Sequence, residues 1–130
     1  MQVIVRAKED KQHPLSDDLA AIVGLEYVSD NEAVRWSYLP DWCIIEDVTP
    51  VAPAIVVRPR TTEEVSKILR LANRTRTPVY TRSGGVQPQG ARGEEMYRSI
   101  LLDMTRMTDL VELDEKSLTA TIQAGATWMK

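Results

Sequence analysis

A short glycine loop carries the groups in this chain that are best suited to hold a phosphate. After an apolar run ending at Thr81 come a cation and a hydroxyl, Arg82 and Ser83, followed by Gly84 and Gly85. Successive backbone N–H groups in such a turn can form a concave site for an anion, and an arginine adds charge-assisted hydrogen bonds. Taken alone, the pattern also fits a tight turn with a solvated arginine.

The residues after the glycines argue against a phosphate site at a helix start. In dinucleotide fingerprints and Walker loops, the glycines open a helix whose positive end meets the phosphate. Here Pro88, Gly90 and Gly93 follow, and a helix across them would lose about 1 kcal/mol per glycine and about 3 kcal/mol for the proline. Backbone N–H groups alone would therefore have to hold the anion.

Thiolate and imidazole chemistry has few residues to draw on. Cys43 is the only cysteine and His13 the only histidine, which excludes an intrachain disulfide and a multi-thiolate metal site and fits a reducing cytosol. We interpret Cys43 as a buried apolar residue and His13 as a solvated one. No catalytic acid or base can be assigned, and the four tyrosines are better suited to packing or surface roles than to catalysis. They are Tyr27, Tyr38, Tyr80 and Tyr97.

Composition is that of a single soluble globular domain. The 130 residues are 43% hydrophobic and 27% charged, with a formal net charge of −3. This balance argues against a general nucleic-acid surface. No segment approaches the roughly 20 apolar residues of a membrane span. We expect a cytoplasmic protein, or one peripheral to the membrane as part of a larger complex.

The segments before the loop predict a parallel strand-helix-strand unit. Residues 54–57 are a continuous apolar run between prolines, which is typical of a strand covered on both faces. Thr61 and Glu64 have the spacing of a capping box, and the apolar stripe that follows predicts a helix ending near Asn73. Residues 79–81 resume as a strand, so the glycine loop leaves a carboxyl end, where open α/β sheets bind ligands.

The remaining segments complete an α+β prediction. Residues 100–104 read as a further strand, and the runs 110–113 and 118–124 as an antiparallel hairpin with one buried face. Residues 15–23 predict a docking helix, with Ser16 as a possible cap and Gly24 as its stop. Residues 31–47 lack a clean period and predict an irregular or short helical segment.

The last residues predict a loop and the first turn of a helix with Thr127 as its cap. Because domains seldom end one turn into an element, we expect the chain to be a piece of a longer protein. The apolar face of the hairpin and Trp128 would then lack their partners. We therefore expect an exposed apolar patch and self-association.

Several segments together resemble the N-terminal half of the FAD-binding domain in the vanillyl-alcohol oxidase/p-cresol methylhydroxylase (PCMH-type) family. The branch most resembled contains the glycolate oxidase FAD subunit, D-lactate dehydrogenases and D-2-hydroxyglutarate dehydrogenases. The resemblance covers roughly residues 15–130 and implies that residues 1–50 pack on the FAD domain while residues 51–130 form its first part. The segments that carry it are 41–42, 55–65, 78–85, 100–107 and 119–128.

The resemblance implies a cofactor and a function. FAD would be the cofactor, and the flavin would take a hydride from a 2-hydroxy acid of the glycolate or D-lactate type. The chain would be the N-terminal FAD-binding fragment of such an oxidoreductase, inactive without the missing C-terminal part of the same protein. The positions expected at the FAD pyrophosphate are Arg82, Ser83, Gly84, Gly85, Val86, Gln87 and Gly90.

Two positions depart from the family pattern. Members that attach FAD covalently through this loop carry a histidine where Val86 stands, which implies that FAD is non-covalent here unless a residue beyond Lys130 makes the link. The run Gln87-Pro88-Gln89 replaces small residues, and Pro88 removes one N–H donor, so the grip on pyrophosphate could be weaker.

Two other functions remain open at this point. The chain could come from another branch of the family, such as the ether-lipid synthase or sugar-nucleotide reductase type. It could also be a non-enzymatic module that binds a phosphorylated effector or a partner protein. Ligand preference separates these alternatives, because a pyrophosphate loop should prefer FAD and ADP to inorganic phosphate.

Overall fold

The computed structural model describes residues 12–39, 51–84 and 94–127 of the chain. Within these ranges the fold is α+β, with a small parallel unit followed by an antiparallel hairpin, as the sequence predicts. The elements before the glycine loop are α1 (Ser16–Val23), β1 (Val28–Ser29), α2 (Glu32–Trp36), β2 (Ile55–Val57), α3 (Thr62–Thr75) and β3 (Val79–Arg82). Those after it are α4 (Glu94–Tyr97), β4 (Ile100–Asp103), β5 (Leu110–Asp114) and β6 (Thr119–Ile122).

The main sheet has four strands in the order β1-β2-β4-β3. Strands β2, β4 and β3 run parallel, while β1 pairs antiparallel with β2. Strand β4 lies between β2 and β3, so the two strands joined by α3 do not pair with each other. Every residue of β2 and β4 is buried, which confirms strands covered on both faces.

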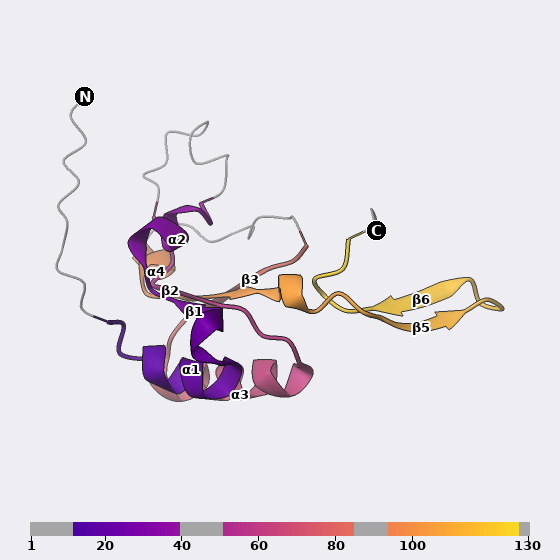
Figure 1. The fold of residues 1–130 in the computed structure, drawn as a ribbon, viewed down its shortest axis with the longest axis horizontal. Coiled ribbons are helices and arrows are strands. Elements are labelled where there is room, and N and C mark those ends of the chain that lie inside the picture. The colour runs from indigo at the N-terminus through magenta and orange to yellow at the C-terminus, as the bar shows by residue number, and fades with distance from the viewer. Residues whose placement is uncertain (1–11, 40–50, 85–93, 128–130) are drawn as a thin grey trace, which may run out of the picture.

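Helices lie on both sides of this sheet. In Figure 1, α1 and α3 lie on one side of it and α2 and α4 on the other. Side chains alternate along a strand, so Ile55 and Val57 share the helix-packed core while Val56 faces the opposite side, 2% exposed. The core cluster on the side of α1 and α3 comprises Leu19, Val23, Ile55, Val57, Ile68, Leu71, Ala72, Ile100, Leu102, Met104 and Met107.

The capping box predicted for α3 is confirmed with one difference. The Thr61 hydroxyl accepts a hydrogen bond from the Glu64 N–H at 3.2 Å, while Oε2 of Glu64 accepts from the Arg60 N–H at 2.7 Å, one residue before the cap. The helix ends at Thr75, later than predicted, where Arg76 adopts the left-handed conformation with φ 52°. One of the orphan N–H groups of the first turn, that of Glu64, is thus satisfied by the cap side chain, and the Arg60 N–H before the cap by the Glu64 carboxylate.

Helix α1 forms within the predicted residues, but the predicted Ser16 cap and the predicted solvation of His13 are wrong. Ser16 does not cap the helix; it lies inside the first turn, and its hydroxyl donates to Asp30 Oδ2 at 2.9 Å. His13 is half-buried rather than solvated, and its N–H donates to the same oxygen at 2.7 Å. A carboxylate that follows β1 therefore organises this helix start. Gly24, with φ 96°, ends the helix as predicted.

Helix α2 is the part of the predicted irregular segment that the structure describes. Asn31 caps it, because its Oδ1 accepts from the N–H groups of Ala33 at 3.0 Å and Val34 at 3.4 Å. Residues 40–50, with Cys43 among them, lie outside the described residues. Among the described residues, no helix combines the length and the hydropathy that a transmembrane span requires.

The hairpin of β5 and β6 projects away from the main sheet (Figure 1). Its register is interrupted at Val111, so that Leu110 pairs with Ile122 and Leu113 with Ala120. This irregularity places all four paired residues on one face, although Leu110 and Leu113 are an odd number of positions apart. The side chains of both strands are largely exposed, which confirms the predicted exposed apolar patch. The prediction that one face of the hairpin is buried is not confirmed. No described element covers this face as a packed layer.

Candidate functional site

Three charged residues meet at the carboxyl ends of the parallel strands. Arg58 directly follows β2, Asp103 ends β4 and Arg82 ends β3. On β3, Arg82 is in direct register with Asp103 of β4. On the other side of β4, the pairing of Val57 with Leu102 places Arg58, the next residue after β2, alongside Asp103. Because strand order puts β4 in the centre, Asp103 lies between the two arginines on one face of the sheet.

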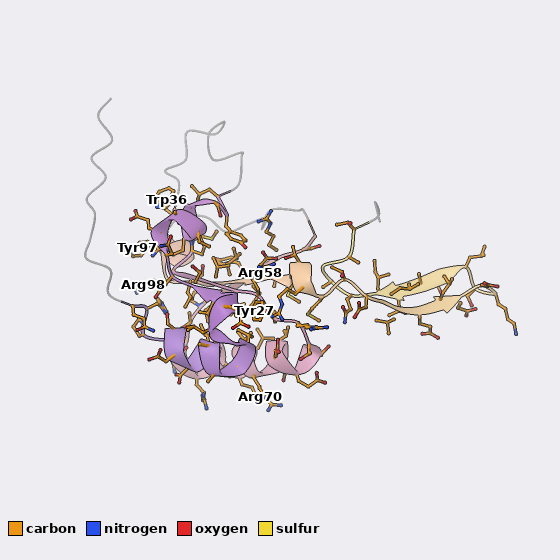
Figure 2. The ribbon with its side chains drawn as sticks, viewed as in Figure 1. Tyr27, Trp36, Arg58, Arg70, Tyr97 and Arg98 are labelled. Atoms are coloured by element: carbon orange, nitrogen blue, oxygen red, sulfur yellow. The ribbon has the colours of Figure 1, made fainter. Side chains whose placement is uncertain are left out.

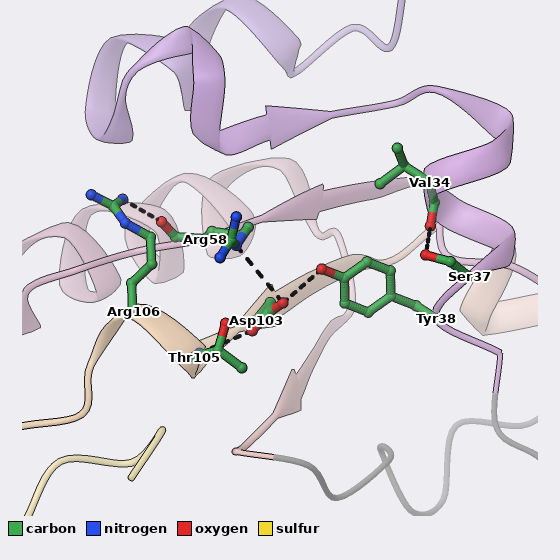
Figure 3. A network of polar contacts seen from close by, with 7 residues as sticks. All are labelled: Val34, Ser37, Tyr38, Arg58, Asp103, Thr105 and Arg106. Atoms are coloured by element: carbon green, nitrogen blue, oxygen red, sulfur yellow. Dashed lines mark hydrogen bonds and ion pairs between the residues drawn. The ribbon is translucent and has the colours of Figure 1, made fainter.

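The Asp103 carboxylate is buried and fully engaged. Its Oδ2 accepts from the Tyr38 hydroxyl at 2.6 Å and lies 3.9 Å from Nε of Arg58, while Oδ1 accepts from the Thr105 N–H at 2.9 Å (Figure 3). Burial raises the pKa of Asp103, but the hydrogen bonds from Thr105 and Tyr38 and the Arg58 charge outweigh it. The net pKa lies below the ordinary value, so Asp103 is ionised at neutral pH.

Tyr38 connects this carboxylate to Arg82. Burial, followed by the hydrogen bond to Asp103, raises the pKa of Tyr38 to about 12, so its hydroxyl remains a donor. The Arg82 guanidinium carbon lies 5.0 Å from the centroid of the Tyr38 ring, which is within cation–π distance. One tyrosine therefore contacts both the central anion and one of the flanking cations.

Arg82 carries a buried donor without a partner. Its Nε is inaccessible to solvent and donates no hydrogen bond within the part of the chain that the structure describes. Leaving a buried donor unsatisfied costs about 1–3 kcal/mol, and more for a charged group. A hydrogen-bond acceptor brought to this nitrogen would relieve that cost.

Gly84 and Gly125 permit close packing of the loops at this edge. A Cβ on Gly84 would collide with the carbonyl oxygen of Gly125, and a Cβ on Gly125 would collide with that of Met104. The Gly125 N–H also donates to the Met107 carbonyl at 2.8 Å. Glycine is required at both positions because the loops after β3, β4 and β6 are in direct backbone contact.

Arg106 supports the other side of the site. Its Nη1 donates to the Arg58 carbonyl at 2.7 Å (Figure 3), and its guanidinium carbon lies 3.3 Å from the centroid of the Tyr27 ring. Tyr27 in turn packs against the hydrophobic core. The backbone that carries Arg58 is thus attached to the core through a cation–π contact.

The predicted site residues fall in two groups. Arg82, Ser83 and Gly84 lie at the carboxyl end of β3, where Ser83 is exposed. Gly85, Val86, Gln87 and Gly90 lie outside the described residues.

Sequence reasoning missed Asp103 and underestimated Tyr38. The available signal was positional: Arg58, Arg82 and Asp103 each end or follow an apolar run, and such residues meet at one edge of a parallel sheet. The described residues hold no group of three or more metal-ligating His, Cys, Asp or Glu side chains.

The family model described as "FAD binding domain" matches residues 53–130, more than half of the chain. The chain belongs to the FAD-binding domain family. This FAD-binding domain resembles the glycolate oxidase subunit GlcD of Bacillus subtilis, with 32% identity over 114 residues that cover 85% of the chain and 23% of the relative. It is also 37% identical to the mitochondrial D-lactate dehydrogenase (cytochrome) 1 of Saccharomyces cerevisiae over 78 residues, 58% of the chain and 13% of the relative.

Solved structures share the fold of this FAD-binding domain. p-Cresol methylhydroxylase superposes with a TM-score of 0.72 at 21% identity, covering 87% of this chain and 22% of that one. An alkyldihydroxyacetonephosphate synthase superposes with a TM-score of 0.73 at 22% identity, covering 97% and 25%. The fold is therefore of the PCMH type. The chain spans about a quarter or less of the length of each of these proteins.

The residues at the carboxyl edge fit the cofactor of this family. FAD carries a pyrophosphate, and the edge offers the Arg82 guanidinium, whose Nε has no hydrogen-bond partner among the described residues, next to Ser83 and Gly84. Arg58 adds a half-exposed cation on the other side of Asp103. The donor set thus favours an anionic group at the start of the glycine loop.

Proposed function

We propose that this chain binds FAD non-covalently, with the pyrophosphate held by the loop from Arg82 to Gly90. The observation that carries the proposal is Arg82, whose buried Nε lacks a hydrogen-bond partner among the described residues directly before that loop. The residues proposed to contact the cofactor are Arg82, Ser83, Gly84, Gly85, Val86, Gln87 and Gly90.

We further propose that the whole protein is a flavin-dependent oxidoreductase acting on a 2-hydroxy acid. The similarity to relatives named glycolate oxidase subunit and D-lactate dehydrogenase supports this substrate class. The flavin would supply the hydride chemistry, while the residues of this chain bind and orient it. The isolated chain would be inactive, because the rest of the flavin site and the substrate site would lie in the missing C-terminal part of the same protein.

Reconstitution with FAD tests the binding proposal. We expect the protein to acquire flavin absorbance when it is incubated with FAD and then freed of excess cofactor on a desalting column. Arg82→Ala should retain less flavin than the matched surface variant Arg70→Ala, because Arg70 lies on an exposed face of α3, away from Arg58 (Figure 2). A protein that stays colourless after reconstitution would refute the proposal.

The link between protein and flavin is proposed to be dissociable. Val86 occupies the position of the histidine through which some family members attach FAD, and an aliphatic side chain cannot form that bond. Denaturing the reconstituted protein in acid and sedimenting the polypeptide should therefore leave the flavin in solution. Flavin that sediments with the polypeptide would show a covalent bond and contradict this part.

We also propose a division of labour along the chain, with residues 1–50 packing on an FAD domain that begins near residue 51. Leu19 and Val23 of α1 support it, because they enter the same core as β2 and β4. The exposed face of the β5–β6 hairpin would be covered by the remaining part of the full-length protein or, in its absence, by a second copy of the chain.

The ether-lipid synthase type is the main alternative. The structural match to alkyldihydroxyacetonephosphate synthase, which covers 97% of this chain, supports this alternative. Anaerobic addition of D-lactate or glycolate to the FAD-loaded full-length protein separates the two. Bleaching of the flavin supports the hydroxy-acid oxidase, and flavin that stays oxidised with both acids would favour the alternative.

A further inference from the structure

We propose that Tyr38 is a positioning residue that keeps the Arg82 guanidinium available for the pyrophosphate. The inference rests on the proposed function and goes beyond it, because Tyr38 lies outside residues 53–130, which match the FAD-binding domain. A segment that precedes the matched domain would thereby complete its phosphate site.

The first argument is competition for Asp103. Arg82 and Asp103 are in direct register on neighbouring strands, where opposite charges normally attract and pair. Instead, Oδ2 of Asp103 accepts from the Tyr38 hydroxyl at 2.6 Å, and the carboxylate forms its ion pair with Arg58. Tyr38 and Arg58 thus engage the Asp103 oxygen with which Arg82 would otherwise pair.

The second argument is the placement of the Tyr38 ring. The guanidinium carbon of Arg82 lies 5.0 Å from the ring centroid, so the aromatic face attracts the cation without using any of its N–H donors. An arginine has many rotamers to lose on binding an anion, and a side chain already held in place loses fewer of them. Tyr38 therefore orients Arg82 without engaging its donors, of which Nε has no partner among the described residues.

The third argument is that Tyr38 is itself held firmly. The backbone N–H of Tyr38 donates to the Arg35 carbonyl at 3.2 Å, which continues the turn at the end of α2. The neighbouring Ser37 hydroxyl donates to the Val34 carbonyl at 2.6 Å (Figure 3). With its hydroxyl fixed by Asp103, the side chain is anchored at both ends.

A double-mutant cycle with ADP as the probe tests this role. Calorimetry would measure ADP dissociation constants for the wild type, Tyr38→Leu, Arg82→Ala and the double variant. We expect Tyr38→Leu to weaken binding by about fivefold, the scale of a partly desolvated cation–π contact. The same change should have no effect in the Arg82→Ala background, because Tyr38 acts through Arg82. The matched control Tyr97→Leu, at an exposed residue of α4, should not change binding.

A rescue experiment separates positioning from simple packing. Tyr38→Phe keeps the ring but frees Asp103 to pair with Arg82, so ADP binding should weaken by about threefold, the scale of one hydrogen bond. Replacing the competing carboxylate in Tyr38→Phe/Asp103→Asn should restore binding. If Tyr38 only packed, the second substitution would lower affinity further. This pair also retains the ring if Tyr38→Leu does not fold.

The outcomes distinguish the two proposals. A wild type that does not bind ADP, or an Arg82→Ala variant that binds it normally, would overturn the proposed function and this inference with it. If Arg82→Ala weakens binding while the effects of Tyr38→Leu and Arg82→Ala multiply, the proposed function stands and the positioning role of Tyr38 is refuted. Loss of the Tyr38 effect in the Arg82→Ala background, together with rescue by Asp103→Asn, supports both.

Discussion

The Tyr38 hydroxyl donates a 2.6 Å hydrogen bond to Oδ2 of Asp103, a residue 65 positions later in the chain. This bond joins the end of α2 to the central parallel strand at the edge where Arg58 and Arg82 also lie. Burial and this bond raise the pKa of Tyr38, whereas hydrogen bonds from Thr105 and Tyr38 and the charge of Arg58 outweigh burial and lower the pKa of Asp103. The two residues can therefore be tested independently by titration.

The phenol of Tyr38 should ionise at a higher pH than an ordinary tyrosine. Its pKa is raised to about 12 by burial and by the bond to Asp103, compared with 10.0 for an ordinary tyrosine. We expect the difference between the phenolate absorbance titrations of the wild type and Tyr38→Phe to show one group with a midpoint near 12. Because the folded pKa is raised, the stability that Tyr38 contributes is complete below 10.0 and is lost as the pH rises toward 12. A difference titration centred at 10.0 would contradict the buried hydrogen bond.

Asp103 should contribute stability that disappears in acid. Its folded pKa lies below the ordinary 3.8, so its contribution is present above that value and is lost as the pH falls through the folded pKa. Asp103→Asn should lower the free energy of unfolding at pH ~7, because one amide oxygen cannot replace both carboxylate oxygens as acceptors for Tyr38 and Thr105. We expect the difference from the wild type to shrink in acid. The exposed control Asp18→Asn should change the free energy of unfolding little. If Asp103→Asn lowered the free energy of unfolding by the same amount at every pH, the result would contradict the proposed role of the carboxylate.

Gly125 should tolerate no side chain. A Cβ there would collide with the backbone carbonyl of Met104, which cannot move without disturbing the end of β4. We expect Gly125→Ala to lose about 1–3 kcal/mol of unfolding free energy, as overpacked sites do. Chemical denaturation would measure the loss against Ala124→Ser, which adds one atom at an exposed neighbour. Equal stability of the two variants would show that these loops are not in close contact.

The apolar face of the hairpin should make the isolated chain self-associate. Leu113 is 60% exposed and Ile122 is 46% exposed on this face, and contiguous exposed apolar surface favours association. Leu113→Lys should shift the chain toward monomer in sedimentation-velocity experiments at high concentration. Thr121→Lys adds the same charge on the opposite, polar face and should change the distribution less. A wild type that is monomeric throughout would refute the prediction.

The sequence predicts local features of this fold better than those that depend on distant contacts. The capping box of Thr61 and Glu64 and the apolar run of β2 are readable because their determinants are a few residues apart. Strand β1 has only two residues and no periodicity, and the irregularity at Val111 depends on strand pairing. The Ser16 cap is wrong because Asp30, from beyond the helix, binds its hydroxyl.

In the candidate site, too, the sequence predicts the local features but not those that depend on distant contacts. Arg82 and the glycines can be found from the order of strand and loop, and the FAD family from several segments in series. Tyr38 lies in an aperiodic segment, and nothing local distinguishes it from a packing residue. Its role depends on the insertion of β4 between β2 and β3, which brings Asp103 beside Arg82 and within reach of the end of α2.

Calorimetric titration of the chain with FAD, ADP and riboflavin tests the central claim most directly. If the loop that starts at Arg82 holds the pyrophosphate, FAD and ADP should both bind, riboflavin should bind far more weakly because it lacks that group, and Arg82→Ala should weaken FAD and ADP together. Equal binding of riboflavin and FAD, or no binding of FAD by the folded chain, would contradict the claim.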